Sequence, residues 1–129
     1  MQLSYLLRTV LKLDAASCLG MAALVLPAAG TLQSSLGIDA ALLQAAAAPL
    51  IPIGLYMLWL GTRREASPGF IWLVILGNVG WTPASLVAAT TIPGITPLGQ
   101  LAITAQGLAV LGLAMLEWLG LRQSRAAVA

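Results

Sequence analysis

The chain has 129 residues, of which 60% are hydrophobic and only 8% are charged. Soluble domains average about 45–50% apolar and about 25% charged residues, so this composition excludes an ordinary soluble domain and indicates a membrane protein. Four membrane-spanning helices of about 20 residues each would occupy most of the chain. We therefore expect a single integral membrane domain over residues 1–129, without room for a separate soluble domain.

Long apolar runs predict four membrane-spanning helices, at about residues 12–28, 39–61, 68–90 and 97–121. The runs are continuous rather than alternating. In lipid a helix satisfies its own backbone hydrogen bonds, whereas an open sheet edge does not. The predicted fold class is therefore all-α, and the short links between the spans favour an up-down four-helix bundle.

Prolines interrupt two of these runs. Pro49 and Pro52 lie in the second predicted span, and Pro83 lies in the third. Because a proline removes a backbone N–H donor and crowds the preceding turn, both helices should bend there. Two interpretations stay open: ordinary irregularity of membrane helices, or a bend that opens a cavity between the second and third spans.

The basic residues predict the orientation of the chain in the membrane. All six lie before the first span, between the second and third, or after the fourth: Arg8, Lys12, Arg63, Arg64, Arg122 and Arg125. Short loops rich in Lys and Arg stay in the cytoplasm, so we expect both termini to be cytoplasmic. The alanine-rich, lysine-poor composition favours the inner membrane of a bacterium. The net charge of +2 needs no nucleic acid to explain it, because cations near a membrane also suit anionic lipid headgroups.

The sequence Trp-Leu-Gly-x-Arg occurs twice, at residues 59–63 and 118–122. Superposing the two copies also lays the second span on the fourth and the first on the third. One interpretation is a tandem repeat of a helical hairpin, with its symmetry axis along the membrane normal. The other is convergence, because Trp and Arg are common at a cytoplasmic membrane interface.

Small residues are the best sign of helix contacts in lipid, because they let two backbones approach closely. They recur at helical spacing in the third and fourth spans: Gly77, Gly80, Ala84 and Ala88, then Ala102, Ala105, Ala109 and Gly112. We expect both stripes to face other helices.

Polar side chains inside a membrane are expensive and are therefore the default candidates for a functional site. Asn78 lies about 15 Å into the third span, near the bilayer centre. Trp81 and Ser85 follow it on the same helix face, and Gln106 lies in the outer half of the fourth span. These four are the candidate ligand-binding residues. The alternatives are a hydrogen bond between helices for Asn78 and a place in the core for Trp81.

Asp14 in the first span and Glu117 in the fourth lie at similar depth if those helices are neighbours. Two acids close together can share one proton, which would support proton-coupled transport. The alternative is that each acid forms an ion pair between helices, since Lys12 and Arg122 are near them in the sequence.

The residue inventory excludes most cofactor chemistry. The chain has no histidine and a single cysteine, Cys18. It therefore cannot form a disulfide, a metal-ligand cluster of the usual kind or a Ser-His-Asp set on its own. We expect no metal and no cofactor, and a packing role for Cys18.

Leu11-Lys12-Leu13-Asp14-Ala15, Asn78-Val79-Gly80-Trp81 and a Gln-bearing last span that ends in Leu116-Glu117 resemble segments of small uncharacterised bacterial four-helix membrane proteins. The resemblance covers the whole chain and implies the same topology, but no activity. Small multidrug-resistance transporters are similar in size and carry a membrane carboxylate in their first helix. This sequence departs from them because Asp14 lies near the interface and the first span contains no Glu.

We expect a non-enzymatic helix-bundle protein that contacts membrane lipid and either acts through contacts with itself or a larger complex, or holds an apolar ligand. The alternative is a small proton-coupled transporter that works as a homodimer. In that interpretation Asp14 and Glu117 are the proton sites, and Asn78 with Trp81 forms the substrate wall. A third interpretation is a membrane-embedded enzyme that uses Asp14 as an acid.

Overall fold

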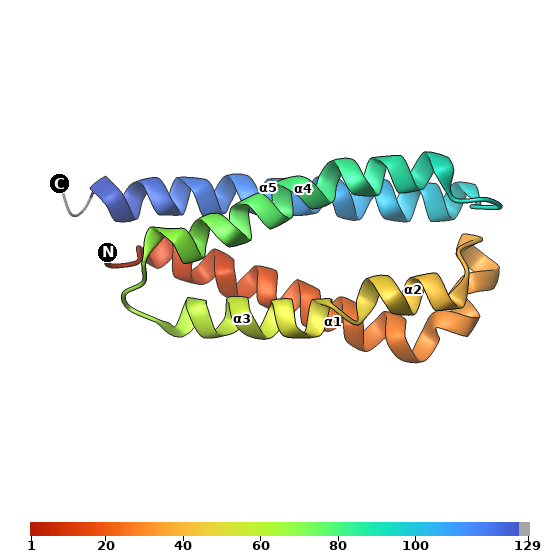
Figure 1. Cartoon of the computed structure of the whole chain (residues 1–129), viewed down its shortest axis with the longest axis horizontal. Coiled ribbons are helices and arrows are strands. Elements are labelled where there is room, and N and C mark those ends of the chain that lie inside the picture. The colour runs from red at the N-terminus through yellow and green to blue at the C-terminus, as the bar shows by residue number, and fades with distance from the viewer. Residues whose placement is uncertain (127–129) are drawn as a thin grey trace.

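The computed structural model of the protein describes residues 1–126, which contain five helices. They are α1 (Tyr5–Leu36), α2 (Ala40–Ala47), α3 (Leu50–Thr62), α4 (Pro68–Thr91) and α5 (Pro97–Ala126). Taken together, α2 and α3 are long and apolar enough to cross a membrane, and so is each of the other three helices. The prediction of an all-α fold with four long apolar helices is confirmed (Figure 1).

The helix α1 is longer at both ends than the predicted span, residues 12–28. It begins directly after Ser4, whose hydroxyl accepts a hydrogen bond of 3.1 Å from the Leu7 backbone N–H and so caps the helix. It continues through Pro27 and ends at Gly37, whose φ of 68° is a left-handed conformation that glycine adopts without strain. At 1.5 Å per residue the helix is about 48 Å long, so it must tilt in the hydrocarbon layer or extend beyond it.

The second predicted span consists of two helices. A turn at Ala48 and Pro49 separates α2 from α3. Because Pro49 has no backbone N–H and its ring crowds the preceding turn, the first helix ends before it. The expected interruption at this proline is confirmed, whereas α4 runs through Pro83 as one helix.

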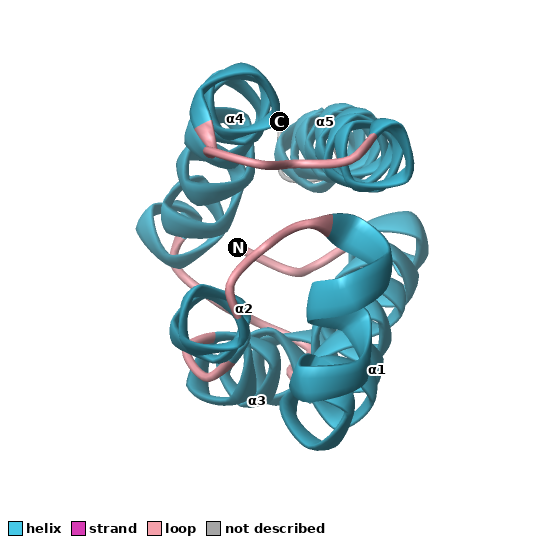
Figure 2. Ribbon diagram, turned by 90° about the vertical axis from the view of Figure 1, so that its right-hand side faces the viewer, coloured by secondary structure: helices cyan, strands magenta, loops and turns pink. Residues whose placement is uncertain are grey.

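The helices pack as two groups. One group is formed by α1 with α2 and α3, the other by α4 with α5, and contacts between α1 and α5 join them. Figures 1 and 2 show α4 and α5 on one side of the molecule and α1, α2 and α3 on the other. Although α4 follows α3 in the chain, it packs against α5 rather than against α3. Consequently α3 and α4 meet through side chains, and their backbones do not approach closely.

Hydrogen bonds join the two groups at both ends of the bundle. At the end that carries both termini (Figure 1), the N-terminal segment pairs with the link between α3 and α4. There the Ser4 backbone N–H also donates to Ser124 Oγ at 2.8 Å. At the opposite end, the Thr96 backbone N–H donates to the Leu36 carbonyl oxygen at 3.0 Å. The two groups are therefore held together at both ends.

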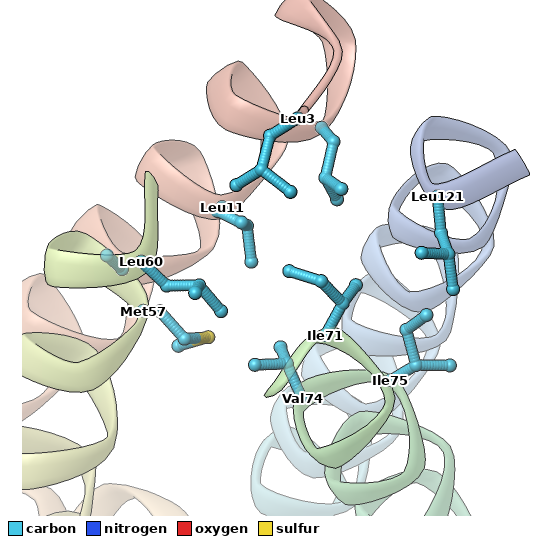
Figure 3. Packing of buried hydrophobic residues seen from close by; sticks show 10 residues of the cluster. Leu3, Leu11, Met57, Leu60, Ile71, Val74, Ile75 and Leu121 are labelled. Carbon is cyan, nitrogen blue, oxygen red and sulfur yellow. The ribbon is translucent and has the colours of Figure 1, made fainter. Parts of the chain in front are cut away.

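The main apolar cluster lies toward the end that carries the termini and draws residues from all four spans. Its members are Leu3, Leu7, Leu11, Ala15, Met57, Leu60, Ile71, Val74, Ile75 and Leu121. Figure 3 shows these side chains meeting between the helices. Many other large apolar side chains are exposed on the outside of the bundle, as a surface that faces lipid requires.

The prediction that the stripes of small residues face other helices is wrong for most of their members. Gly77, Gly80 and Gly112 are exposed, and a Cβ added at any of them would meet nothing within 4 Å. The glycines that α5 buries against its neighbours include Gly107 and Gly120, which lie outside the predicted stripe. Small residues occur on several faces of these helices, so their spacing alone does not identify the face in contact.

Candidate functional site

Three polar side chains from three helices meet inside the bundle. Asn78 on α4 donates two hydrogen bonds through Nδ2, one to Asp14 Oδ2 on α1 at 2.6 Å and one to Glu117 Oε2 on α5 at 3.1 Å. Asp14 is 1% exposed and Glu117 is 0% exposed. One amide therefore joins two buried carboxylates that lie close enough to interact strongly.

The cations near these acids in the sequence point elsewhere. Lys12 and Arg122 are exposed, and the Arg122 guanidinium carbon lies 4.9 Å from the centroid of the Trp118 ring. The structure thus gives Asp14 and Glu117 a neutral amide as their partner instead of the ion pairs that the sequence allowed. Asn78 carries no charge, so it does not neutralise a negative charge on either acid.

The two acids differ in how many of their carboxylate oxygens have a hydrogen-bond partner. Cys18, one turn after Asp14 on α1, places its Sγ 3.8 Å from Asp14 Oδ1, so both oxygens of Asp14 have a donor. A thiol is a weak donor, and Asn78 therefore carries most of this interaction. Glu117 Oε1 is buried and has no hydrogen-bond partner within residues 1–126. Glu117 is consequently the acid with an unused acceptor.

A groove of about 410 Å³ opens between α3 and α4, whose backbones do not approach closely. Its lining is mostly apolar and consists of Pro52, Ile53, Tyr56, Met57, Leu73, Val74, Gly77 and Asn78. The hydroxyl of Tyr56 donates to the Phe70 carbonyl oxygen at 3.2 Å, so its proton is already used. Pockets that hold small molecules measure about 300–1,000 Å³, so this groove is large enough for one.

Asn78 belongs to both the groove and the acid cluster. Both of its N–H donors are directed at carboxylate oxygens. The reverse orientation of the amide would place Oδ1 against those oxygens, so the hydrogen-bond pattern assigns the orientation. Within the described part of the chain no group donates to Oδ1. The Asn78 Oδ1 atom therefore stays available as a hydrogen-bond acceptor.

A second polar network joins α4 to α5 and is separate from the acids. Trp81 Nε1 donates to Gln106 Oε1 at 2.9 Å, and Gln106 Nε2 donates to Ser85 Oγ at 2.8 Å. The next residue on α4, Thr82, donates through Oγ1 to the Gly107 carbonyl oxygen at 3.0 Å. Because these polar groups are paired with one another, the network suits a contact between two helices better than recognition of a ligand.

The six candidate residues thus divide into two sets. Asp14, Asn78 and Glu117 form one, and Trp81, Ser85 and Gln106 form the other. The sequence did not identify the side chains of α3 that line the groove, Tyr56 and Met57 among them. The sequence feature that could have indicated them is the pair of prolines in the second span. One of the two interpretations of these prolines was a cavity between the second and third spans.

No family model, curated protein or solved structure matches this chain. The resemblance to small bacterial membrane proteins rests on short sequence segments alone, and no family is identified. The fold itself is that of a membrane protein with four candidate spans.

Proposed function

We propose that the protein is a multi-pass protein of the bacterial inner membrane with both termini in the cytoplasm. The supporting observation is the position of the cations. Arg63 and Arg64 lie in the link that pairs with the N-terminal segment, and Arg122 and Arg125 lie in the last turns of α5. Loops rich in Lys and Arg are retained in the cytoplasm, so this end of the bundle is assigned to that side.

In this membrane, the protein binds a mostly apolar molecule in the groove between α3 and α4. Ile53 and Leu73 on the two sides of the groove are 47% and 64% exposed, so a molecule can enter directly from the lipid. An apolar lining offers little to a strongly polar ligand, because its polar groups would lose hydration without compensation. A lipid-like molecule fits this lining.

The polar group of the ligand is a hydrogen-bond donor. Asn78 Oδ1 is an acceptor without a donor among the described residues, and it is held beside two acids. A hydroxyl or an amine could donate to it, whereas a carboxylate would be repelled by Asp14 and Glu117. The single observation that carries this proposal is the hydrogen bonding of Asn78. Both of its N–H donors are used, and its Oδ1 acceptor is not.

Photolabelling tests the proposed ligand class. In lipid nanodiscs, a long-chain primary alcohol that carries a diazirine should label peptides of α3 and α4. The corresponding carboxylic acid should label them about fivefold less, because it gains no hydrogen bond worth about 1 kcal/mol and brings a negative charge. Mass spectrometry of the digested protein measures both yields. Equal labelling by alcohol and acid would contradict the assigned polar group.

A pair of glycine variants tests the groove itself. Gly77→Trp should remove most of the labelling by the alcohol, because the indole would fill the groove that Gly77 lines. Gly112→Trp on α5 is the matched control, since a Cβ at either glycine meets nothing within 4 Å and Gly112 does not line the groove. If Gly77→Trp is labelled as strongly as the control, the groove is not the binding site.

A proton-coupled transporter that works as a homodimer is the second candidate. It is favoured by the two buried acids, of which Glu117 has an oxygen without a partner. Two carboxylates that share one amide can hold a proton between them, and a cation could replace that proton. Because four helices are few to enclose a pathway, a second copy of the chain would complete it.

Transport can be measured in sealed vesicles that contain a pH indicator. Addition of dodecyltrimethylammonium, a permanent cation with an apolar tail, should make the lumen alkaline as protons leave in exchange. Glu117→Gln should abolish this change, whereas Asp39→Asn, which removes an exposed acid outside the cluster, should not. A response no larger than that of protein-free vesicles would exclude transport of this cation and leave the binding proposal in place.

A further inference from the structure

A second cavity lies at the end of the bundle that carries the termini. It measures about 880 Å³ and is bounded by the N-terminal segment, the end of α3 and the start of α4. Three of the six cations of the chain line it, Arg8, Arg63 and Arg64, together with one acid, Glu65. The charged side chains of this cavity therefore carry a net charge of +2.

Arg8, which lines this cavity, has an unused hydrogen-bond donor. Its Nε is buried and has no acceptor in the described part of the chain. Buried guanidinium donors are nearly always paired, because the lost hydration is otherwise not compensated. Arg63 and Arg64 are exposed and line the same cavity as Arg8. The three side chains thus offer several N–H donors to one anion.

The aromatic lining places this cavity at the membrane interface. Trp59 and Phe70 both line it, with their rings in an edge-to-face arrangement at a centroid distance of 6.2 Å. The Arg63 guanidinium carbon lies 4.7 Å from the Trp59 ring centroid, an arrangement that leaves the in-plane N–H groups free to donate. Tryptophan beside arginine is typical of the depth of lipid headgroups.

We propose that this cavity binds a phosphate group, through charge-assisted hydrogen bonds from Arg8, Arg63 and Arg64. The planar fork of a guanidinium matches two phosphate oxygens, which makes arginine well suited to this anion. The phosphate belongs either to the headgroup of an anionic lipid or to free phosphate from the cytoplasm. This site is independent of the groove between α3 and α4 and of the function proposed for that groove.

The chain provides a matched control for this site. Trp118 and Arg122 repeat the Trp59 and Arg63 pair, with the guanidinium carbon 4.9 Å from the ring centroid, but they do not line the cavity. Arg122→Gln therefore removes one cation from the same end of the bundle without changing the proposed site. Arg64 is exposed, so Arg64→Gln should fold normally even if Arg8→Gln does not.

Lipid titration by native mass spectrometry tests the proposal. Arg8→Gln and Arg64→Gln should each weaken the binding of phosphatidylglycerol at least about tenfold, as expected for the loss of a charge-assisted hydrogen bond. Arg122→Gln should weaken it no more than about fivefold, the effect of a single cation near an anionic surface. Equal losses in all three variants, or no loss in Arg64→Gln, would overturn the site.

A second experiment distinguishes free phosphate from a lipid headgroup as the source of the phosphate. In phosphatidylcholine nanodiscs, inorganic phosphate should raise the unfolding temperature of the wild type, but not that of Arg64→Gln, if free phosphate is the ligand. If phosphate has no effect while phosphatidylglycerol binds selectively, the ligand is a lipid headgroup. Absence of both effects in the wild type would refute the proposal.

Discussion

Asn78→Leu should lower the free energy of unfolding by about 2–5 kcal/mol. The substitution removes two hydrogen bonds to buried carboxylates. In membrane proteins such bonds are worth about 0.6–2 kcal/mol each, and loss of the partner of a buried charge costs about 3–5 kcal/mol. Leucine has the same branched shape and the same number of side-chain heavy atoms as asparagine, so the loss comes mainly from the hydrogen bonds. Unfolding by sodium dodecyl sulfate in mixed micelles would measure the difference.

Two further variants show whether the acids cause this loss. Gln44→Leu removes an amide that is exposed on α2 and should leave stability unchanged or slightly higher. Neutralising both acids with Asp14→Asn and Glu117→Gln in the Asn78→Leu background should restore part of the stability, because no charge is then left without a partner. If Asn78→Leu alone is as stable as the wild type, the amide does not hold the two carboxylates.

The sequence identified the members of this cluster but not their contacts. Asp14, Asn78 and Glu117 stand out because polar groups are rare inside a membrane. The alternative of ion pairs between helices required Lys12 and Arg122 to point into the bundle, and both side chains are exposed. A partner on another helix depends on which spans pack together, and apolar runs do not contain that information.

Helix ends were predictable where the side chains mark them and not elsewhere. α4 and α5 begin at the predicted residues, Pro68 and Pro97, because proline is common in the first turn of a helix. α1 was predicted too short, since its first turns carry Arg8 and Lys12 and its last turns follow Pro27. Hydropathy detects the part of a helix that lies in lipid, and a helix longer than the bilayer continues beyond it.

The two Trp-Leu-Gly-x-Arg segments behave alike in the structure. In each, the Arg stacks on the Trp at the outside of the bundle. The glycine between them lies against α1 in both copies, Gly61 in the first and Gly120 in the second. The motif therefore combines an interfacial anchor with a close helix contact. This shared use is expected from duplication and from convergence alike.

Gly120→Ala should lower the free energy of unfolding by up to about 2 kcal/mol. A Cβ at position 120 would lie 2.8 Å from Leu7 Cα and 2.9 Å from the Leu7 backbone nitrogen, so α5 and α1 would have to move apart. Overpacking of this kind costs about 1–3 kcal/mol. Alanine also favours the helix by about 1 kcal/mol relative to glycine, which partly offsets the clash. The same unfolding titration in mixed micelles gives the value.

Alanine substitutions at Gly61 and Gly112 provide a comparison with Gly120→Ala. They separate the effect of the steric clash from the effect of helix propensity. At Gly61 the added Cβ would meet the flexible Lys12 side chain at 3.0 Å and the Arg8 backbone oxygen at 3.2 Å. Its backbone contact is longer than the 2.8 Å and 2.9 Å contacts at Gly120, so Gly61→Ala should be less harmful than Gly120→Ala. Gly112→Ala meets no atom within 4 Å and should be neutral or stabilising by up to about 1 kcal/mol. The order Gly120, Gly61, Gly112 therefore follows from how close and how rigid the contacted atoms are. An equal effect at all three positions would mean that propensity, and not the approach of α5 to α1, determines the result.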